Sequence, residues 1–153
     1  MVDRVNVLHA SVERATDSLA RDLRLGSVIA VLQFPAIPEE HEWSSTRALS
    51  RWKSTSDEIG ELVTGRMSRF KGLSAVERSQ ALQVLRERQH QQASEVLTDE
   101  EAAGRGRELK ADVVVLGTIR VARGELATVF LRSVRVSDSR VLNSAKVGPI
   151  EMP

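Results

Sequence analysis

Few residues in this sequence have the types and the spacing that catalysis or cofactor binding requires. Gly104-Arg105-Gly106 contains two glycines of a dinucleotide-binding turn, but the third glycine is missing and no predicted strand leads into it. We interpret these glycines as small residues that let a helix approach a sheet closely. No phosphate-binding loop and no Gly-x-Ser-x-Gly nucleophile turn occurs. The sequence therefore predicts no catalytic residue, no cofactor and no enzymatic activity.

Residues that bind metal ions are equally sparse. The chain has no Cys, which excludes thiolate zinc sites and disulfides. His41 lies among the glutamates of residues 39–42, and we interpret this cluster as a solvated loop rather than a metal site. A second acidic group, at residues 57–61, is expected at the start of a helix, where the helix dipole stabilises negative charge. We therefore predict no metal site.

The residues that could contact a partner lie in a polar segment, residues 35–53. This segment shows neither the period of a helix nor that of a strand, so we expect a long loop, a kind of segment that is often functional. Its two tryptophans either pack as a lid or serve as exposed anchors for a partner. An enzyme that holds substrate carboxylates or phosphates with the basic residues of the loop (Arg47, Arg51 and Lys53) is an alternative. The predicted partner-binding residues are Trp43, Trp52, Arg47 and Arg51.

Composition narrows the class of protein. A length of 153 residues with 41% hydrophobic residues suits one domain with its own core. The 22 basic residues balance 21 acidic ones, and only 3% of the residues are aromatic, which argues against a nucleic-acid partner. No apolar run approaches the roughly 20 residues of a membrane-spanning helix. The first ten residues also lack the basic region and apolar stretch of a signal peptide.

The hydrophobic pattern predicts helices and strands that alternate along the chain. Helices are expected at residues 2–25, at 54–72, from Ser79 and at 98–110, and strands at 27–34, 73–77, 113–117, 125–136 and 141–147. Capping boxes within residues 54–58 and at Thr98 mark two helix starts. This order predicts an α/β fold: a mixed sheet with helices packed on it, ending in a C-terminal β-hairpin or meander.

The sequence divides into a helix and a domain. Residues 1–26 are expected to form an N-terminal amphipathic helix, and residues 27–150 the α/β domain. The apolar side chains of this helix recur every three or four residues, so one face is apolar. The helix packs either on the sheet of its own domain or on a partner.

Four segments, in this order, resemble those of CsgG/FlgO/LpoB-type envelope domains, whose fold is similar to the N-terminal domain of TolB. The resemblance covers about residues 27–148. The four segments are residues 28–34 (VIAVLQF), 76–89 (VERSQALQVLRERQ), 110–119 (KADVVVLGTI) and 134–142 (VRVSDSRVL). In the last segment, Ser139 stands where the family has a turn glycine.

The resemblance implies a non-enzymatic module of the bacterial cell envelope that docks or assembles in the periplasm at the outer membrane. Its role would lie in secretion, in a flagellar ring or in the activation of a cell-wall synthase, and its partner would be an envelope protein, further copies of itself, or both. Family members are commonly lipoproteins, and we expect the export signal and the lipid anchor outside the sequence shown.

Two further expectations concern the membrane and small ligands. The family's channels insert strands into the membrane, but the turns expected here at 118–125 and 137–140 are too short for strands of about 9–11 residues. We therefore expect no membrane-spanning segment and no pore. The alternative function is that of a cytoplasmic small-ligand-binding regulatory domain. Its ligand would lie beyond the carboxyl ends of the strands, near Pro35 and Gly117.

Overall fold

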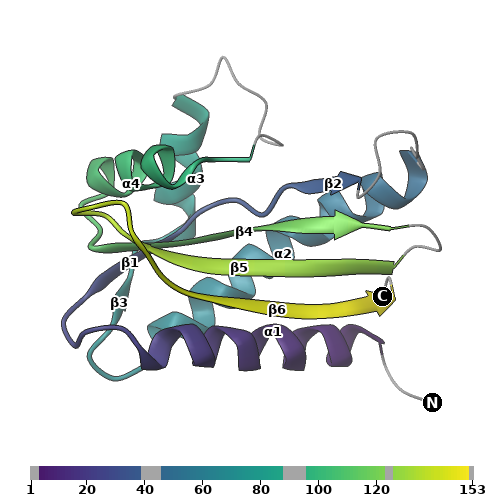
Figure 1. Cartoon of the computed structure of the whole chain (residues 1–153), viewed down its shortest axis with the longest axis horizontal. Coiled ribbons are helices and arrows are strands. Elements are labelled where there is room, and N and C mark those ends of the chain that lie inside the picture. Colours follow the sequence, from purple (N-terminus) through teal and green to yellow (C-terminus); the bar gives the residue numbers. More distant parts are fainter. Residues whose placement is uncertain (1–3, 39–45, 88–95, 123–125, 152–153) are drawn as a thin grey trace.

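A computed structural model of the chain describes residues 4–38, 46–87, 96–122 and 126–151 (Figure 1). In this part of the chain, four helices pack on a six-stranded mixed sheet. The helices are α1 (Arg4–Arg21), α2 (Thr46–Ser68), α3 (Arg78–Glu87) and α4 (Asp99–Glu108). The strands are β1 (Val28–Val31), β2 (Ala36–Pro38), β3 (Ser74–Ala75), β4 (Val113–Val121), β5 (Leu126–Arg135) and β6 (Val141–Glu151). This architecture confirms the predicted fold class.

The sheet has a parallel half and an antiparallel half. Its strand order is β3-β1-β4-β5-β6, and β2 also pairs with β4. β1 and β2 run parallel to the first and second halves of β4, so that Ile29 lies opposite Val113 and Ala36 opposite Ile119. β4, β5 and β6 form an antiparallel meander, as predicted.

The larger core lies between the sheet and helices α1 and α2. Apolar residues three or four positions apart give each of these helices one buried face. These residues include Leu8, Val12, Ala15 and Leu19 of α1 and Trp52, Ile59, Val63 and Met67 of α2. α1 also contacts β6. The prediction that the N-terminal helix packs on the sheet of its own domain is therefore confirmed.

The smaller core lies on the opposite face of the sheet, under α3 and α4. Gly106 brings α4 close to the strands, because a Cβ there would lie 2.5 Å from Val136 Cγ2 and 2.7 Å from Val114 Cγ1. A Cβ at Gly104 would meet nothing within 4 Å. The predicted close approach of helix and sheet is confirmed for Gly106 and wrong for Gly104.

The predicted loop over residues 35–53 is wrong in two places. Residues Ala36–Pro38 form β2, and α2 begins at Thr46. The capping box predicted within residues 54–58 is wrong for the same reason, since those residues lie inside α2. The hydroxyls of Ser54 and Thr55 instead donate to the backbone carbonyls four residues earlier, at 3.3 and 3.1 Å.

The predicted turn over residues 118–125 is also wrong in its first half. Residues 118–121 continue β4, where they pair with β2 on one side and β5 on the other. Gly117 is therefore a mid-strand residue rather than the end of a strand. A Cβ at Gly117 would lie 1.8 Å from the Phe130 carbonyl oxygen and 2.9 Å from the Phe34 ring. This glycine lets the neighbouring strand and the ring pack closely.

Candidate functional site

The predicted partner-binding residues do not form one exposed group in the described part of the chain. Trp52 lies on the inner face of α2 and is fully buried in the larger core. Its indole nitrogen has no hydrogen-bond partner among the described residues. Arg51 is exposed on the same helix. Trp43 and the side chain of Arg47 lie outside the described residues, and partner binding by these four residues stays a prediction.

The acidic residues at 57–61 lie in the middle of α2, not at a helix start as predicted, because the helix begins at Thr46. The Glu58 carboxylate lies 3.4 Å from His9 Nε2 on α1. Burial lowers the pKa of Arg78, and the negative charges of Asp57 and Glu61 oppose this shift only in part. The Arg78 guanidinium donates to the backbone carbonyls at the end of β1. The Glu58 contact thus joins α2 to α1, and Arg78 joins the start of α3 to β1.

The predicted loop cluster around His41 lies outside the described residues. Within the described ranges, no group of three His, Asp or Glu side chains is placed to hold a metal ion. Beyond Pro35 and Gly117, where the alternative function places a ligand, the Phe34 ring fills the space next to Gly117. Among the described helices, none combines the length and the apolar character needed to cross a bilayer.

An exposed part of the sheet is the first candidate for a functional surface. Alternate side chains of β5 point to opposite faces, so Ala127, Val129 and Leu131 enter the larger core. The side chains between them lie on the face that carries α3 and α4. Of the residues on that face, those near the end of β5 are covered, whereas Phe130 remains 37% exposed. We call this uncovered part the open face: it consists of Arg120, Thr128, Phe130, Arg132, Ser144 and Lys146.

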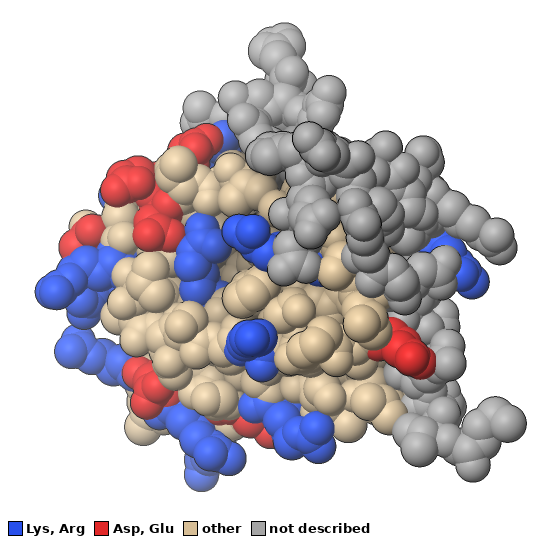
Figure 2. Space-filling model, turned by 45° about the vertical axis from the view of Figure 1, so that its right-hand side comes forward, with Lys and Arg blue, Asp and Glu red and all other residues tan. Residues whose placement is uncertain are grey.

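The open face combines an aromatic ring with positive charge. The Arg120 guanidinium lies 5.8 Å from the centroid of the Phe130 ring, within the range of a cation–π contact. Lys146 is paired directly with Phe130 across β5 and β6 and is exposed. A depression of about 430 Å³ lies over this part of the sheet. In Figure 2 most of this side of the molecule is uncharged, and a few Lys and Arg side chains are spaced across it.

One cation of the open face is already paired. The Arg132 guanidinium donates to the Asp99 carboxylate at 2.8 Å and to the Leu97 carbonyl at 2.9 Å. It therefore joins the open face to the start of α4. Among the described residues, no acidic side chain is paired with Arg120 or Lys146. These two cations remain available to an acidic partner.

The fold and the open face together define a class of protein. It is a three-layer α/β domain whose C-terminal meander has an uncovered area that carries basic side chains. No protein-family model matches the sequence, and no curated protein matches it. Solved structures do share the fold.

Three of the matching structures are of LpoB. The LpoB C-terminal domain from Salmonella enterica matches with a TM-score of 0.63 at 13% identity, covering 90% of this chain and 93% of that one. The same domain from Escherichia coli gives 0.62 at 13% identity, with 91% and 95% covered. An NMR structure of E. coli LpoB gives 0.65 at 14% identity, with 89% and 64% covered. The chain therefore has the LpoB C-terminal domain fold, as the sequence resemblance predicted.

Proposed function

We propose that this protein is a non-enzymatic module of the bacterial cell envelope. It acts in the periplasm at the outer membrane, where its open face binds an acidic surface of another envelope protein. One observation carries the proposal: a chain with the LpoB fold leaves Phe130 exposed between two cations on the uncovered part of its sheet. Activation of a cell-wall synthase, a flagellar ring and secretion are the roles that the sequence resemblance implies.

The chemistry of the open face suits protein docking. An aromatic ring supplies a large contact area at a low entropic cost, and such rings often carry much of the binding energy of an interface. Arg120 and Lys146 flank the ring and attract a negatively charged surface during the encounter. An acidic partner surface that covers the ring would therefore satisfy both parts of the open face at once.

The first test is photo-cross-linking in intact cells. A photoreactive phenylalanine replaces Phe130, and a matched control carries it at Arg14, which is exposed on α1 and lies on a different surface. We expect position 130, but not position 14, to cross-link one exported envelope protein. Cross-linking of the same protein from both positions, or of a cytoplasmic protein from position 130, would overturn the proposal.

The second test measures binding to the purified partner. The double variant Arg120→Glu, Lys146→Glu should weaken binding at least tenfold, because two attractive charges become repulsive. Raising the salt concentration should weaken binding of the wild type more than that of the variant. The control Arg24→Gln changes a cation at a distant site and should bind as the wild type does. Equal affinities for all three proteins would refute docking through the open face.

Self-assembly is distinguished by light scattering across a concentration series. Docking on a different protein predicts a monomer at every concentration. If the chain forms a closed ring instead, its function is self-assembly rather than docking on another protein.

A further inference from the structure

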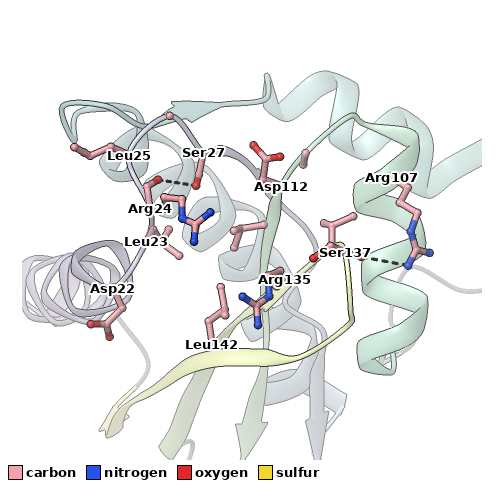
Figure 3. A pocket seen from close by; sticks show the side chains of 14 residues that line it. Asp22, Leu23, Arg24, Leu25, Ser27, Arg107, Asp112, Arg135, Ser137 and Leu142 are labelled. Atoms are coloured by element: carbon pink, nitrogen blue, oxygen red, sulfur yellow. Dashed lines mark hydrogen bonds between the residues drawn. The ribbon is translucent and has the colours of Figure 1, made fainter.

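A second cavity, unrelated to the open face, lies at the amino-terminal ends of β1 and β4. Its volume is about 600 Å³. It is bounded by the connection from α1 to β1, the start of β4 and the turn between β5 and β6 (Figure 3). Three arginines line it, Arg24, Arg107 and Arg135. We call it the arginine pocket.

The two acidic residues that line the pocket are engaged elsewhere. The Asp112 carboxylate accepts the backbone N–H of Val28 at 2.8 Å. The Asp22 carboxylate accepts a hydrogen bond from the Asn143 side chain at 2.6 Å and points away from the cavity in Figure 3. Neither carboxylate forms an ion pair with an arginine of the pocket. Asp22 and Asp112 therefore do not neutralise the arginines of the pocket, although Arg135 forms an ion pair with Asp138 in the turn that follows β5.

The arginines keep much of their hydrogen-bonding capacity. Arg107 donates one N–H to the carbonyl of Val136 at 3.2 Å, and Arg135 donates through Nε to Asp138 at 3.0 Å. Arg24 donates to no other residue of the described part. In Figure 3 the guanidinium groups of Arg24 and Arg135 both extend toward the cavity, and the labelled carboxylates of Asp22 and Asp112 do not lie between them. Two like charges that share a cavity in this way favour an anion between them.

The rest of the lining is apolar. Leu23 and Val136 are buried in the wall, and Leu142 is half-buried. Leu25 lies at the rim of the cavity with 77% of its surface exposed. A planar guanidinium matches the two oxygens of a carboxylate, and an aliphatic group would fill the apolar wall beside it.

We propose that the arginine pocket binds a carboxylate that carries a short aliphatic side chain, with Arg24 and Arg135 holding the two oxygens. A free aliphatic acid and the C-terminal residue of a peptide share this chemistry. Docking through the open face does not depend on this site, so either proposal can fail without the other.

The test uses NMR of the ¹⁵N-labelled full chain. N-acetyl-leucine is titrated in and the backbone amide signals of Gly26, Ser27 and Ser137 are followed. We expect saturable shifts with a Kd of about 1–10 mM, as for a ligand of this size. A tetrapeptide ending in leucine should bind more tightly if the natural ligand is a peptide C-terminus, and no more tightly if it is a free acid.

Two control ligands and two variants make the test specific. N-acetyl-leucine amide lacks the carboxylate and should cause no saturable shift, and inorganic phosphate should bind more weakly than N-acetyl-leucine. Arg24→Gln should weaken binding of N-acetyl-leucine about tenfold, because it removes a charged donor. This variant should fold normally, since the exposed Arg24 side chain has no partner in the described structure. Arg14→Gln removes an exposed arginine of α1 outside the pocket and should bind as the wild type does.

Four results would overturn the proposal. They are the absence of saturable shifts at the pocket amides, equal binding of the acid and its amide, equal binding by the wild type and Arg24→Gln, and tighter binding of phosphate than of N-acetyl-leucine.

Discussion

Two glycines of one helix provide a matched pair of substitutions that tests the packing of α4. Gly104 and Gly106 lie on the same helix, two residues apart. An added Cβ at Gly104 meets nothing within 4 Å, whereas at Gly106 it would lie 2.5 Å from one valine methyl group and 2.7 Å from another. Both valines are buried in the smaller core, so neither can move away easily. Gly104→Ala and Gly106→Ala should therefore have opposite effects on stability.

The magnitudes follow from two competing contributions. Alanine is favoured over glycine inside a helix by about 1 kcal/mol, which is the gain expected for Gly104→Ala. Gly106→Ala has the same gain, but forcing a methyl group into a packed core costs about 1–3 kcal/mol. Its net effect is a loss of about 1 kcal/mol. The two variants should thus differ by about 2 kcal/mol in the free energy of unfolding.

Thermal and denaturant unfolding, followed by circular dichroism, measure this difference. A domain of this size shifts its Tm by about 3 °C per kcal/mol, so the two variants should differ by about 6 °C, with the wild type between them. If Gly106→Ala is as stable as Gly104→Ala, α4 does not pack on β4 and β5 as closely as described here.

Two further substitutions test individual contacts. The Arg66 guanidinium donates to the Asp17 carboxylate at 2.7 and 2.9 Å and lowers the pKa of Asp17. The stabilisation is therefore present above the ordinary aspartate pKa of about 3.9 and is lost as the pH falls through the lowered folded value. Asp17→Asn should cost about 1 kcal/mol at pH 7, and urea unfolding at a series of pH values should show this gap closing in acid. Ser139 has a φ of 61°, in the left-handed region that favours glycine. Ser139→Gly should raise the free energy of unfolding by about 0.5–1 kcal/mol, and an unchanged or lower value would contradict strain at this turn.

Local signals in the sequence predicted the elements whose structure depends on local contacts. The capping box at Thr98 is present: the Glu101 N–H donates to the Thr98 hydroxyl, and the Thr98 N–H donates to the Glu101 carboxylate, both at 3.2 Å. The α1 helix and the β5–β6 hairpin were predictable for the same reason, since their apolar residues recur with a regular period. The family's turn glycine also has a physical explanation, because Ser139 occupies the left-handed conformation there.

The errors arose where tertiary contacts decide the structure. β2 is only three residues long and is bordered by Pro35, so its pattern carried no strand signal, and its pairing with β4 defines it. Gly117 was interpreted as the end of a strand, whereas it allows the close approach of Phe34 inside one. Trp52 lies seven residues before Ile59, on the same helix face. That spacing would have revealed the earlier start of α2.

The candidate surfaces were beyond the reach of sequence patterns. Exposed and buried residues alternate in the first half of β5, as is typical of a strand with one face toward solvent, and the exposed face includes Phe130. Which half of it α3 and α4 leave uncovered depends on how the helices are placed. The arginine pocket joins residues from three separate segments of the chain, so no spacing in the sequence could have indicated it.

The two ends of the molecule along its long axis are built from different parts of the chain. In Figure 1, α1 begins and β6 ends at one end, and the turn from α1 into β1 lies at the other. The 18 residues of α1 span about 27 Å at 1.5 Å per residue. Held to a surface by residues before α1 or after β6, the domain would carry the arginine pocket on its far side. The open face, which runs along the strands, would face sideways toward neighbours on that surface. One domain can thus present two contacts in different directions, one to molecules beside it and one to molecules beyond it.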